Sequence, residues 1–273
     1  MFNPNHRNMS NILVPIGTSA DSFQTLQYAI DYASHTGGQI FVMEVFSFST
    51  ATGNLGNVEE KVAQRSLEQL KEVIAKVDTK GLDVRIATYN GELIDGLESI
   101  DRELGIDLLI MAPRSNDVRE ELYLGHTSGK IVKQTNIPTL IVPKGTVFKP
   151  FKKILTAFGS GILKRNSILD PLIEIKGKFG AEVRLLLVKR PNYTEADLQV
   201  DKALMELGKD LTVSENATTY LGVLEHFRDE RPDLLCVFRR KRGFFKKLWE
   251  KNTIAKSEFY VPIPVLVLSV KKD

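Results

Sequence analysis

Apolar blocks that recur in a fixed order are the feature that most constrains how this chain can fold. Three such blocks each occur twice: Asn11–Val14 and Lys153–Ala157, Asp107–Met111 and Asp233–Phe238, Ile137–Val142 and Ile263–Leu268. The last two pairs share an offset of 126 residues (107 to 233 and 138 to 264), whereas the first pair is 142 residues apart (12 to 154). Matching blocks at a constant spacing predict an internal duplication. The larger first offset predicts shorter middle elements in the second copy.

Each copy alternates short apolar runs with amphipathic segments. In the first copy the expected strands are Asn11–Ile16, Gln39–Phe46, Leu82–Thr88, Asp107–Met111 and Pro138–Pro143. The expected helices between them are Ser19–Thr36, Val58–Val77, Glu92–Leu104 and Thr127–Thr135. Continuous Val, Ile and Leu runs are typical of parallel strands that are covered on both faces. The pattern therefore predicts an α/β fold with two tandem, doubly wound, five-stranded parallel sheets and right-handed crossovers.

The length of 273 residues is consistent with two domains of ordinary size. We expect a flexible N-terminal extension at 1–10, a first domain at 11–144, a linker at 145–152 and a second domain at 153–273. The linker assignment rests on Gly145 and Pro150, which interrupt the apolar pattern before it restarts.

Composition excludes several classes of protein. With 42% hydrophobic and 26% charged residues, the chain has ordinary globular usage, and its net charge of +3 is too small to indicate a nucleic-acid binder. The single cysteine, Cys236, excludes an internal disulfide framework and fits a reducing compartment. We find no secretory signal and no apolar run of 18 residues, so we expect no membrane span and a cytoplasmic location.

The chain resembles a tandem member of the universal stress protein family. The resemblance is carried by the opening Asn11–Pro15, the block Asp107–Met111, the segment Leu124–Ser128 and the ending Asn136–Pro143, with matching blocks in the second half. It implies flavodoxin-like or Rossmann-like domains that pair through their last strands. Some members bind ATP. Those members carry an Asp two residues after the Pro of the first strand, and a G-x2-G-x9-G-[ST] motif after the fourth strand.

This nucleotide motif is degenerate here. The Asp position is Gly17, the two loop glycines fall on Ala112 and Ser115, and only the third glycine is kept, as Gly125. In the second copy Gly159 stands at the Asp position and Lys251 at the third glycine. The candidate nucleotide-binding residues all lie in the first copy: Pro15, Gly17, Val42, Met111, Ala112, Ser115, Gly125, His126, Thr127 and Ser128. Val42 and Met111 would line the adenine and ribose, and Gly125 to Ser128 would hold the phosphates at a helix N-terminus.

The sequence contains no motif for catalysis or metal binding. There is no Ser-His-Asp order, no paired-carboxylate motif and no G-x-S-x-G elbow, and the four histidines have neither i, i+4 spacing nor a cysteine partner. A basic run at 239–247 interleaves Arg and Lys with Phe. We interpret it as a solvated loop; binding of a small anion or a lipid surface is the alternative, and we do not expect a nucleic-acid partner.

The sequence thus predicts a non-catalytic tandem universal stress protein, a cytoplasmic binding or regulatory module of the stress response with unidentified protein partners. It requires no cofactor. The alternative is an adenine-nucleotide binder or very slow ATPase that uses ATP or AMP in the first domain only. Because exposed apolar edges invite aggregation, we expect Pro138–Pro143 and Ile263–Leu268 to pair with each other in an intramolecular pseudo-dimer. Pairing with another chain, in a homodimer, is the alternative.

Overall fold

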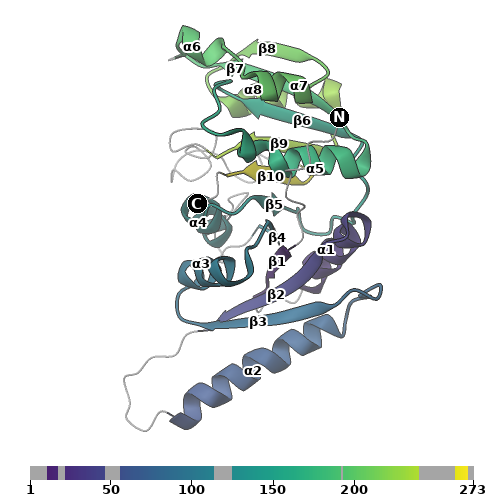
Figure 1. The fold of residues 1–273 in the computed structure, drawn as a ribbon, viewed down its shortest axis with the longest axis vertical. Coiled ribbons are helices and arrows are strands. Elements are labelled where there is room, and N and C mark those ends of the chain that lie inside the picture. The colour runs from purple at the N-terminus through teal and green to yellow at the C-terminus, as the bar shows by residue number, and fades with distance from the viewer. Residues whose placement is uncertain are drawn as a thin grey trace. The chain divides into compact units, whose positions relative to one another are not determined.

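A computed structural model describes residues 11–17, 22–46, 56–113, 125–191, 193–239 and 262–269. The expected extension at 1–10 and most of the basic run, 240–247, lie outside these residues. Figure 1 labels the elements in chain order.

The first copy has the expected alternation of strands and helices. Its elements are β1 (Asn11–Pro15), α1 (Ser22–Thr36), β2 (Gln39–Phe46), α2 (Gly56–Ile74), β3 (Val84–Asn90), α3 (Leu93–Leu104), β4 (Leu108–Met111), α4 (Gly125–Gln134) and β5 (Thr139–Ile141). Apolar runs form most of the strands, and a glycine directly follows helices α1 and α3. Gly105, for example, adopts a left-handed conformation after α3 and donates its N–H to Asp101 O.

Among its described residues, the second copy also alternates strands and helices and has shorter middle elements, as the two offsets predicted. Its elements are β6 (Lys153–Phe158), η1 (Asn166–Leu169), α5 (Asp170–Phe179), β7 (Glu182–Lys189), α6 (Glu195–Leu198), α7 (Lys202–Leu207), β8 (Leu211–Glu215), α8 (Thr219–Glu230), β9 (Leu234–Phe238) and β10 (Val265–Leu268). Where the first copy has the 19-residue α2, the second has only the 4-residue α6 and the 6-residue α7.

Contacts divide the chain into two compact units that differ from the sequence repeats. The N-terminal unit holds residues 9–112 and 144–148, and the C-terminal unit holds 113–143 and 149–273. Helix α4 and strand β5 therefore cluster with the second copy. The repeat boundaries themselves stay a prediction.

In the N-terminal unit the strands are parallel, in the order β3-β2-β1-β4. Gly96 of α3 lies against Met43, while Ser66 of α2 hydrogen-bonds Glu44. Neighbouring residues of a strand point to opposite faces, so α3 covers one face of the sheet, and α2 with its neighbour α1 covers the other (Figure 1).

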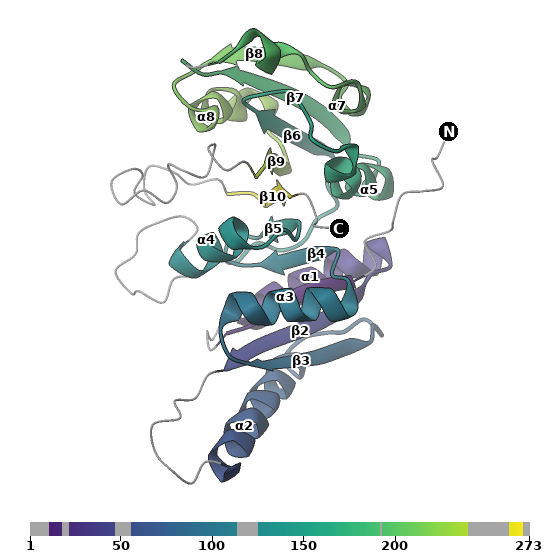
Figure 2. The same cartoon turned by 60° about the vertical axis from the view of Figure 1, so that its left-hand side comes forward.

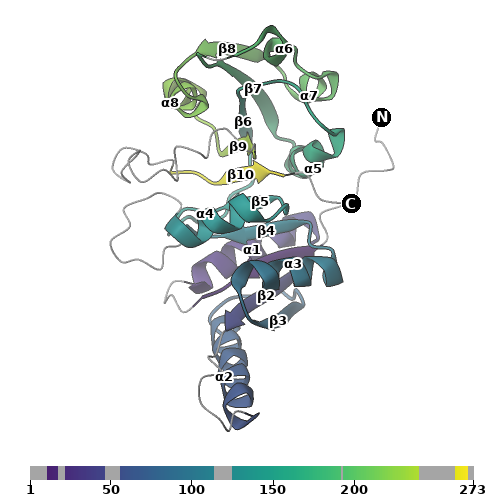
Figure 3. The same ribbon diagram turned by 90° about the vertical axis from the view of Figure 1, so that its left-hand side faces the viewer.

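In the C-terminal unit the order is β5-β10-β9-β6-β7-β8. All described pairs in this unit are parallel except β5 with β10, which run antiparallel with Leu140 opposite Leu266. The expected pairing of the two last strands within one chain is confirmed. Helices α5 and α7 cover one face of β6 and β7 and α8 covers the other, as Figures 2 and 3 show.

One side-chain contact, made by an aspartate, occurs in both copies. Asp107 accepts the backbone N–H of Asn11 through Oδ2 at 3.1 Å, and Asp233 accepts those of Lys152 and Lys153 at 2.9 Å each. Each aspartate also donates its own N–H to the carbonyl of Asn11 or Lys153, at 2.9 Å. The two aspartates thus fasten the start of the first strand in each copy, which explains why the sequence echo begins at Asp.

The expected linker, 145–152, is held by two buried phenylalanines. Phe148 stacks edge-on against Tyr28 and Tyr32 of α1, with ring centroids 5.4 and 5.9 Å away. Phe151 stacks in the same way against Phe179 of α5 at 5.4 Å. Each ring packs inside its own compact unit.

Among the described residues, the structure contains no helix that is both long and apolar enough to cross a membrane.

Candidate functional site

The carboxyl ends of parallel strands are where α/β sheets of this kind bind ligands. At that edge of the N-terminal unit, Pro15 ends β1 opposite Met43, and Ile16 donates its N–H to Met43 O at 2.7 Å. The Gly17 carbonyl accepts a hydrogen bond from Ser22 Oγ at 2.8 Å. This bond joins the end of β1 to Ser22, the first residue of α1.

The side chains expected to line an adenine ring are inside the protein. Val42 is 0% exposed and Met111 is 1% exposed. Gly17, at the Asp position, and Ala112, at the first loop glycine, are partly exposed. A ring placed here would therefore meet mainly backbone unless the core side chains moved.

The residues expected on the phosphate side belong to the start of α4. The helix begins at Gly125, the one motif glycine that the sequence retains. Thr127 is partly exposed and Ser128 is 1% exposed. Ser115 and the side chain of His126 lie outside what the structure describes. The adenine-side residues belong to the N-terminal unit and those of α4 to the C-terminal unit.

In the second copy an arginine packs against the glycine that stands at the Asp position. A Cβ added to Gly159 would lie 2.7 Å from Arg190 Nε and 3.0 Å from Thr219 Oγ1. Real Cβ atoms essentially never come within 3.0 Å of another heavy atom, so the arginine occupies the space that any larger residue at 159 would need. A carboxylate side chain at this position is therefore excluded without rearrangement.

A second segment crosses the same edge. Gly161 donates its N–H to Asp197 O at 2.9 Å, and Asp201 donates to Gly161 O at 3.1 Å. The Asp197 carboxylate caps α6 by accepting from Thr194 N and Oγ1, both at 2.9 Å. Hydrogen bonds from the Thr194 backbone and from Ser160 hold the pKa of Asp197 below its usual value.

The first residue of the basic run has a structural role. Arg239 donates to the carbonyls of Val132, Lys133 and Thr135 at the end of α4, and to Asn136 Oδ1 at 2.6 Å. A cation at a helix C-terminus is favourable because the last carbonyls lack intrahelical partners. Burial lowers the pKa of the Arg239 guanidinium.

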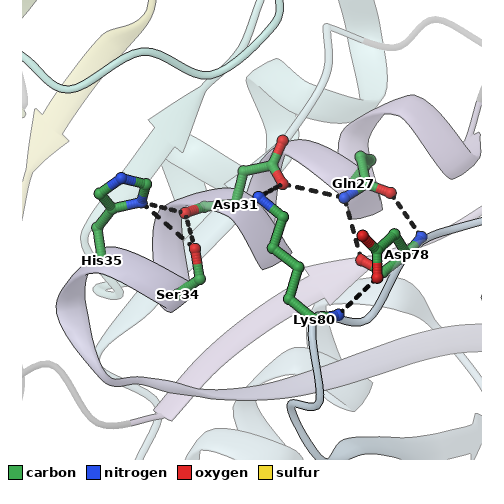
Figure 4. Close-up of polar contacts among 6 residues, drawn as sticks. All are labelled: Gln27, Asp31, Ser34, His35, Asp78 and Lys80. Carbon is green, nitrogen blue, oxygen red and sulfur yellow. Dashed lines mark hydrogen bonds and ion pairs between the residues drawn. The ribbon is translucent and has the colours of Figure 1, made fainter.

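A further polar cluster joins the end of α1 to residues 78–80 (Figure 4). Gln27 exchanges hydrogen bonds with the Asp78 backbone at 2.8 and 3.1 Å, and Lys80 Nζ lies 2.7 Å from Asp31 Oδ1. The bonds from Gln27 and Lys80 anchor the loop after α2, and those of Ser34 and His35 to the Asp31 carbonyl run within α1. Its chemistry is therefore that of a loop clamp.

The thiol and the histidines do not form a reactive centre in the described residues. Cys236 is 0% exposed, and burial raises the pKa of its thiol, which disfavours the nucleophilic thiolate. No group of three or more His, Cys, Asp or Glu residues in the described part of the chain could hold a metal ion.

Sequence reasoning identified Gly159 but missed Arg190, Asp197 and Thr219, which surround its loop. These three residues follow no spacing motif, since each comes from a different segment of the fold. The only sequence signal was their place just after predicted strands or at the start of a helix.

Comparison with known proteins gives the family of the first half. Residues 9–143 match the model of the universal stress protein family. A universal stress protein from Methanocaldococcus jannaschii is 21% identical over 138 residues, which are 49% of this chain and 81% of that protein.

Solved structures match over nearly the whole chain. The crystal structure of a universal stress protein from Archaeoglobus fulgidus covers 96% of this chain and 99% of its own, with a TM-score of 0.69 and 19% identity. A putative universal stress protein from Pseudomonas aeruginosa covers 95% and 93%, with a TM-score of 0.55 and 14% identity. At these identities the likeness shows the fold alone, which extends over both copies.

Proposed function

From the universal stress protein domain that residues 9–143 form, we propose that this protein is a non-catalytic binding or regulatory module of the stress response. It acts in the cytoplasm, requires no cofactor, and works through protein partners. We include both copies in this proposed role because the fold likeness extends over 96% of the chain.

This proposal rests mainly on the residues at the carboxyl end of the first strand in each copy, where nucleotide-binding members carry an aspartate. Gly17 stands at the Asp position of the first copy, and its carbonyl is engaged by Ser22. At the matching place in the second copy, Arg190 packs against Gly159. An edge without the carboxylate lacks the acceptor that would bind adenine, and in the second copy a guanidinium lies beside that position.

The buried thiol supports a non-catalytic role. Cys236 lies in the centre of β9 opposite Thr156 of β6, where a substrate would have to displace core residues to reach it. Its raised pKa keeps it protonated at neutral pH.

Calorimetric titration with ATP and AMP, with and without Mg²⁺, tests the proposal together with a sensitive assay of phosphate release. We expect no saturable heat at millimolar nucleotide and no phosphate release above background. Turnover of ATP at ordinary enzyme rates would overturn the non-catalytic assignment.

A second candidate function is favoured by the start of α4. The helix begins at Gly125, and its first turn carries Thr127 and Ser128, at the end of a helix where the backbone N–H groups favour an anion such as phosphate. On this hypothesis the first copy binds ATP or AMP weakly. Affinity in the micromolar range, about −6 to −8 kcal/mol, would favour it.

The variant Gly17→Asp separates the two candidates. Gly17 is partly exposed and does not have a positive φ, so an aspartate fits its backbone. If the first copy binds adenine, restoring this carboxylate should tighten ATP by roughly tenfold, the value of one charge-assisted hydrogen bond. The matched change Gly177→Asp, at an exposed position of α5 without a positive φ, should leave ATP binding unchanged. Equal binding by both variants would remove the nucleotide hypothesis.

A further inference from the structure

The C-terminal unit contains an arginine, Arg190, whose buried Nε has no hydrogen-bond partner among the residues that the structure describes. Arg190 follows β7 directly and is partly buried. Within the described chain no acceptor lies within bonding distance of the other guanidinium nitrogens, which unlike Nε are not enclosed. Burying part of a cation without an acceptor costs free energy, so this arrangement calls for an explanation.

Packing positions the guanidinium. A Cβ on Gly159 would lie 2.7 Å from Nε and 3.1 Å from Cζ of Arg190, so the absence of a side chain at 159 is what lets the arginine lie there. On the other side is Thr219, whose hydroxyl would be 3.0 Å from the same Cβ. The guanidinium therefore lies beside Gly159 of the β6 edge and near the Thr219 hydroxyl at the start of α8.

The start of α8 adds positive potential to the same place. Thr218 caps this 12-residue helix by accepting the N–H of Leu221 at 3.1 Å, which places Thr219 in its first turn. N–H groups in the first turn of a helix have no intrahelical acceptors and favour anions. A helix start alone would mean little; here it lies beside an arginine without an acceptor.

The charged neighbours of Arg190 are already engaged. Asp197 interacts with Arg190 only at longer range, and its carboxylate accepts from Thr194 N and Oγ1. Lys189 forms an ion pair with Glu215 at 3.4 Å and lies 5.4 Å from the centre of the Tyr193 ring. Neither residue forms a hydrogen bond with Arg190.

We propose that Arg190, Thr219 and the loop at Gly159 form a binding site for a small oxyanion, a carboxylate or phosphate group bound end-on by the two terminal guanidinium nitrogens. Planar guanidinium groups bind such oxyanions in bidentate geometry. The site goes beyond the proposed regulatory role, because it assigns the second copy a ligand of its own, and one that is anionic.

The test is a titration of the full-length protein with sodium phosphate and, separately, sodium acetate, at an ionic strength kept constant with sodium chloride. The readouts are calorimetry and the NMR resonance of the Arg190 Nε–H group. We expect saturable binding of at least one of the two anions, with a shift of that resonance. Binding of phosphate alone would assign a phosphate ligand, and binding of acetate as well would assign a carboxylate.

Two variants and one control make the test specific. Arg190→Gln should weaken binding by at least about tenfold, through loss of the charge-assisted bonds. Gly159→Ala, whose Cβ displaces the guanidinium, should weaken it as well. Arg184→Gln on the same strand should leave binding unchanged, because Arg184 is committed to Glu182 and Glu230. The Nε–H resonance of the unaltered protein decides the question even if Arg190→Gln does not fold. No saturation beyond the chloride baseline, or equal binding by Arg190→Gln, would overturn the proposal.

Discussion

At the scale of single residues, the two copies differ most where they would be expected to bind. Ser22 engages the carbonyl of Gly17 in the first copy, whereas Arg190 packs against Gly159 in the second. Asp107 and Asp233, in contrast, make the same contact in both copies: each carboxylate accepts a backbone N–H at the start of the first strand. Structural contacts have thus been kept through the duplication, while the positions at the ligand edge have diverged.

Asp233 gives a direct test of the strand clamp. Asp233→Ala removes the acceptor of two backbone N–H groups, at Lys152 and Lys153, and should lower the free energy of unfolding by about 1–2 kcal/mol. Denaturant unfolding measures this loss. Asp229→Ala, an exposed change on α8, is the control and should cost no more than about 0.5 kcal/mol. Equal losses in the two variants would contradict the clamp.

The lowered pKa of Asp197 predicts that the stability of the folded protein depends on pH. Its pKa is lowered in the folded protein, first by the hydrogen bond from the Thr194 backbone, so its stabilising contribution is present above its unfolded pKa and lost as the pH falls through the folded value. We expect Asp197→Asn to be less stable than the unaltered protein at pH 7. The difference should shrink on acidification below about pH 4. Unfolding curves at several pH values measure it, and a difference independent of pH would refute the assignment.

At the scale of elements, the sequence predicted what apolar runs can predict. All strands of the first copy were found. Strands β1, β2, β4 and β5 are apolar runs that lie in the sheet core, whereas no residue of β3 is buried. Strand β8 was missed: its residues Leu211–Glu215 leave Val213 half exposed, and only Ser214 is buried. The edge site at Arg190 was missed for another reason. It is assembled by tertiary packing among β6, β7 and α8, and no local spacing records that packing.

Arg239, which follows β9, connects that strand to the end of helix α4 by hydrogen bonds, and this connection can be tested. Arg239→Met removes the donors to the carbonyls at the end of α4 and should destabilise the protein by about 1–2 kcal/mol. Hydrogen exchange should accelerate first in the last turn of α4. Lys202→Met, at a side chain that is 89% exposed, should change neither quantity. Unchanged exchange in α4 would mean that the cap contributes nothing.

At the scale of the whole molecule, the compact units and the sequence repeats divide the chain at different places. Strand β5 belongs to the first repeat, yet it pairs with β10 and clusters with the second copy. The antiparallel pair covers two apolar strand edges at once. A single copy would leave such an edge exposed, which gives a physical reason for joining two copies in one chain.

Leu140 tests whether this pairing couples the repeats. Leu140 and Leu266 face each other, and both are 0% exposed. Leu140→Glu would bury a carboxylate against an apolar strand and should cost about 3–5 kcal/mol. Because the lost contact joins elements of the two repeats, we expect the single unfolding transition to split into two in calorimetry, while the mass measured by light scattering stays that of one chain. Leu140→Met keeps the volume and apolar character and should retain one transition. If Leu140→Glu instead changed only the oligomeric mass, with one cooperative transition, the two strands would pair between chains in solution.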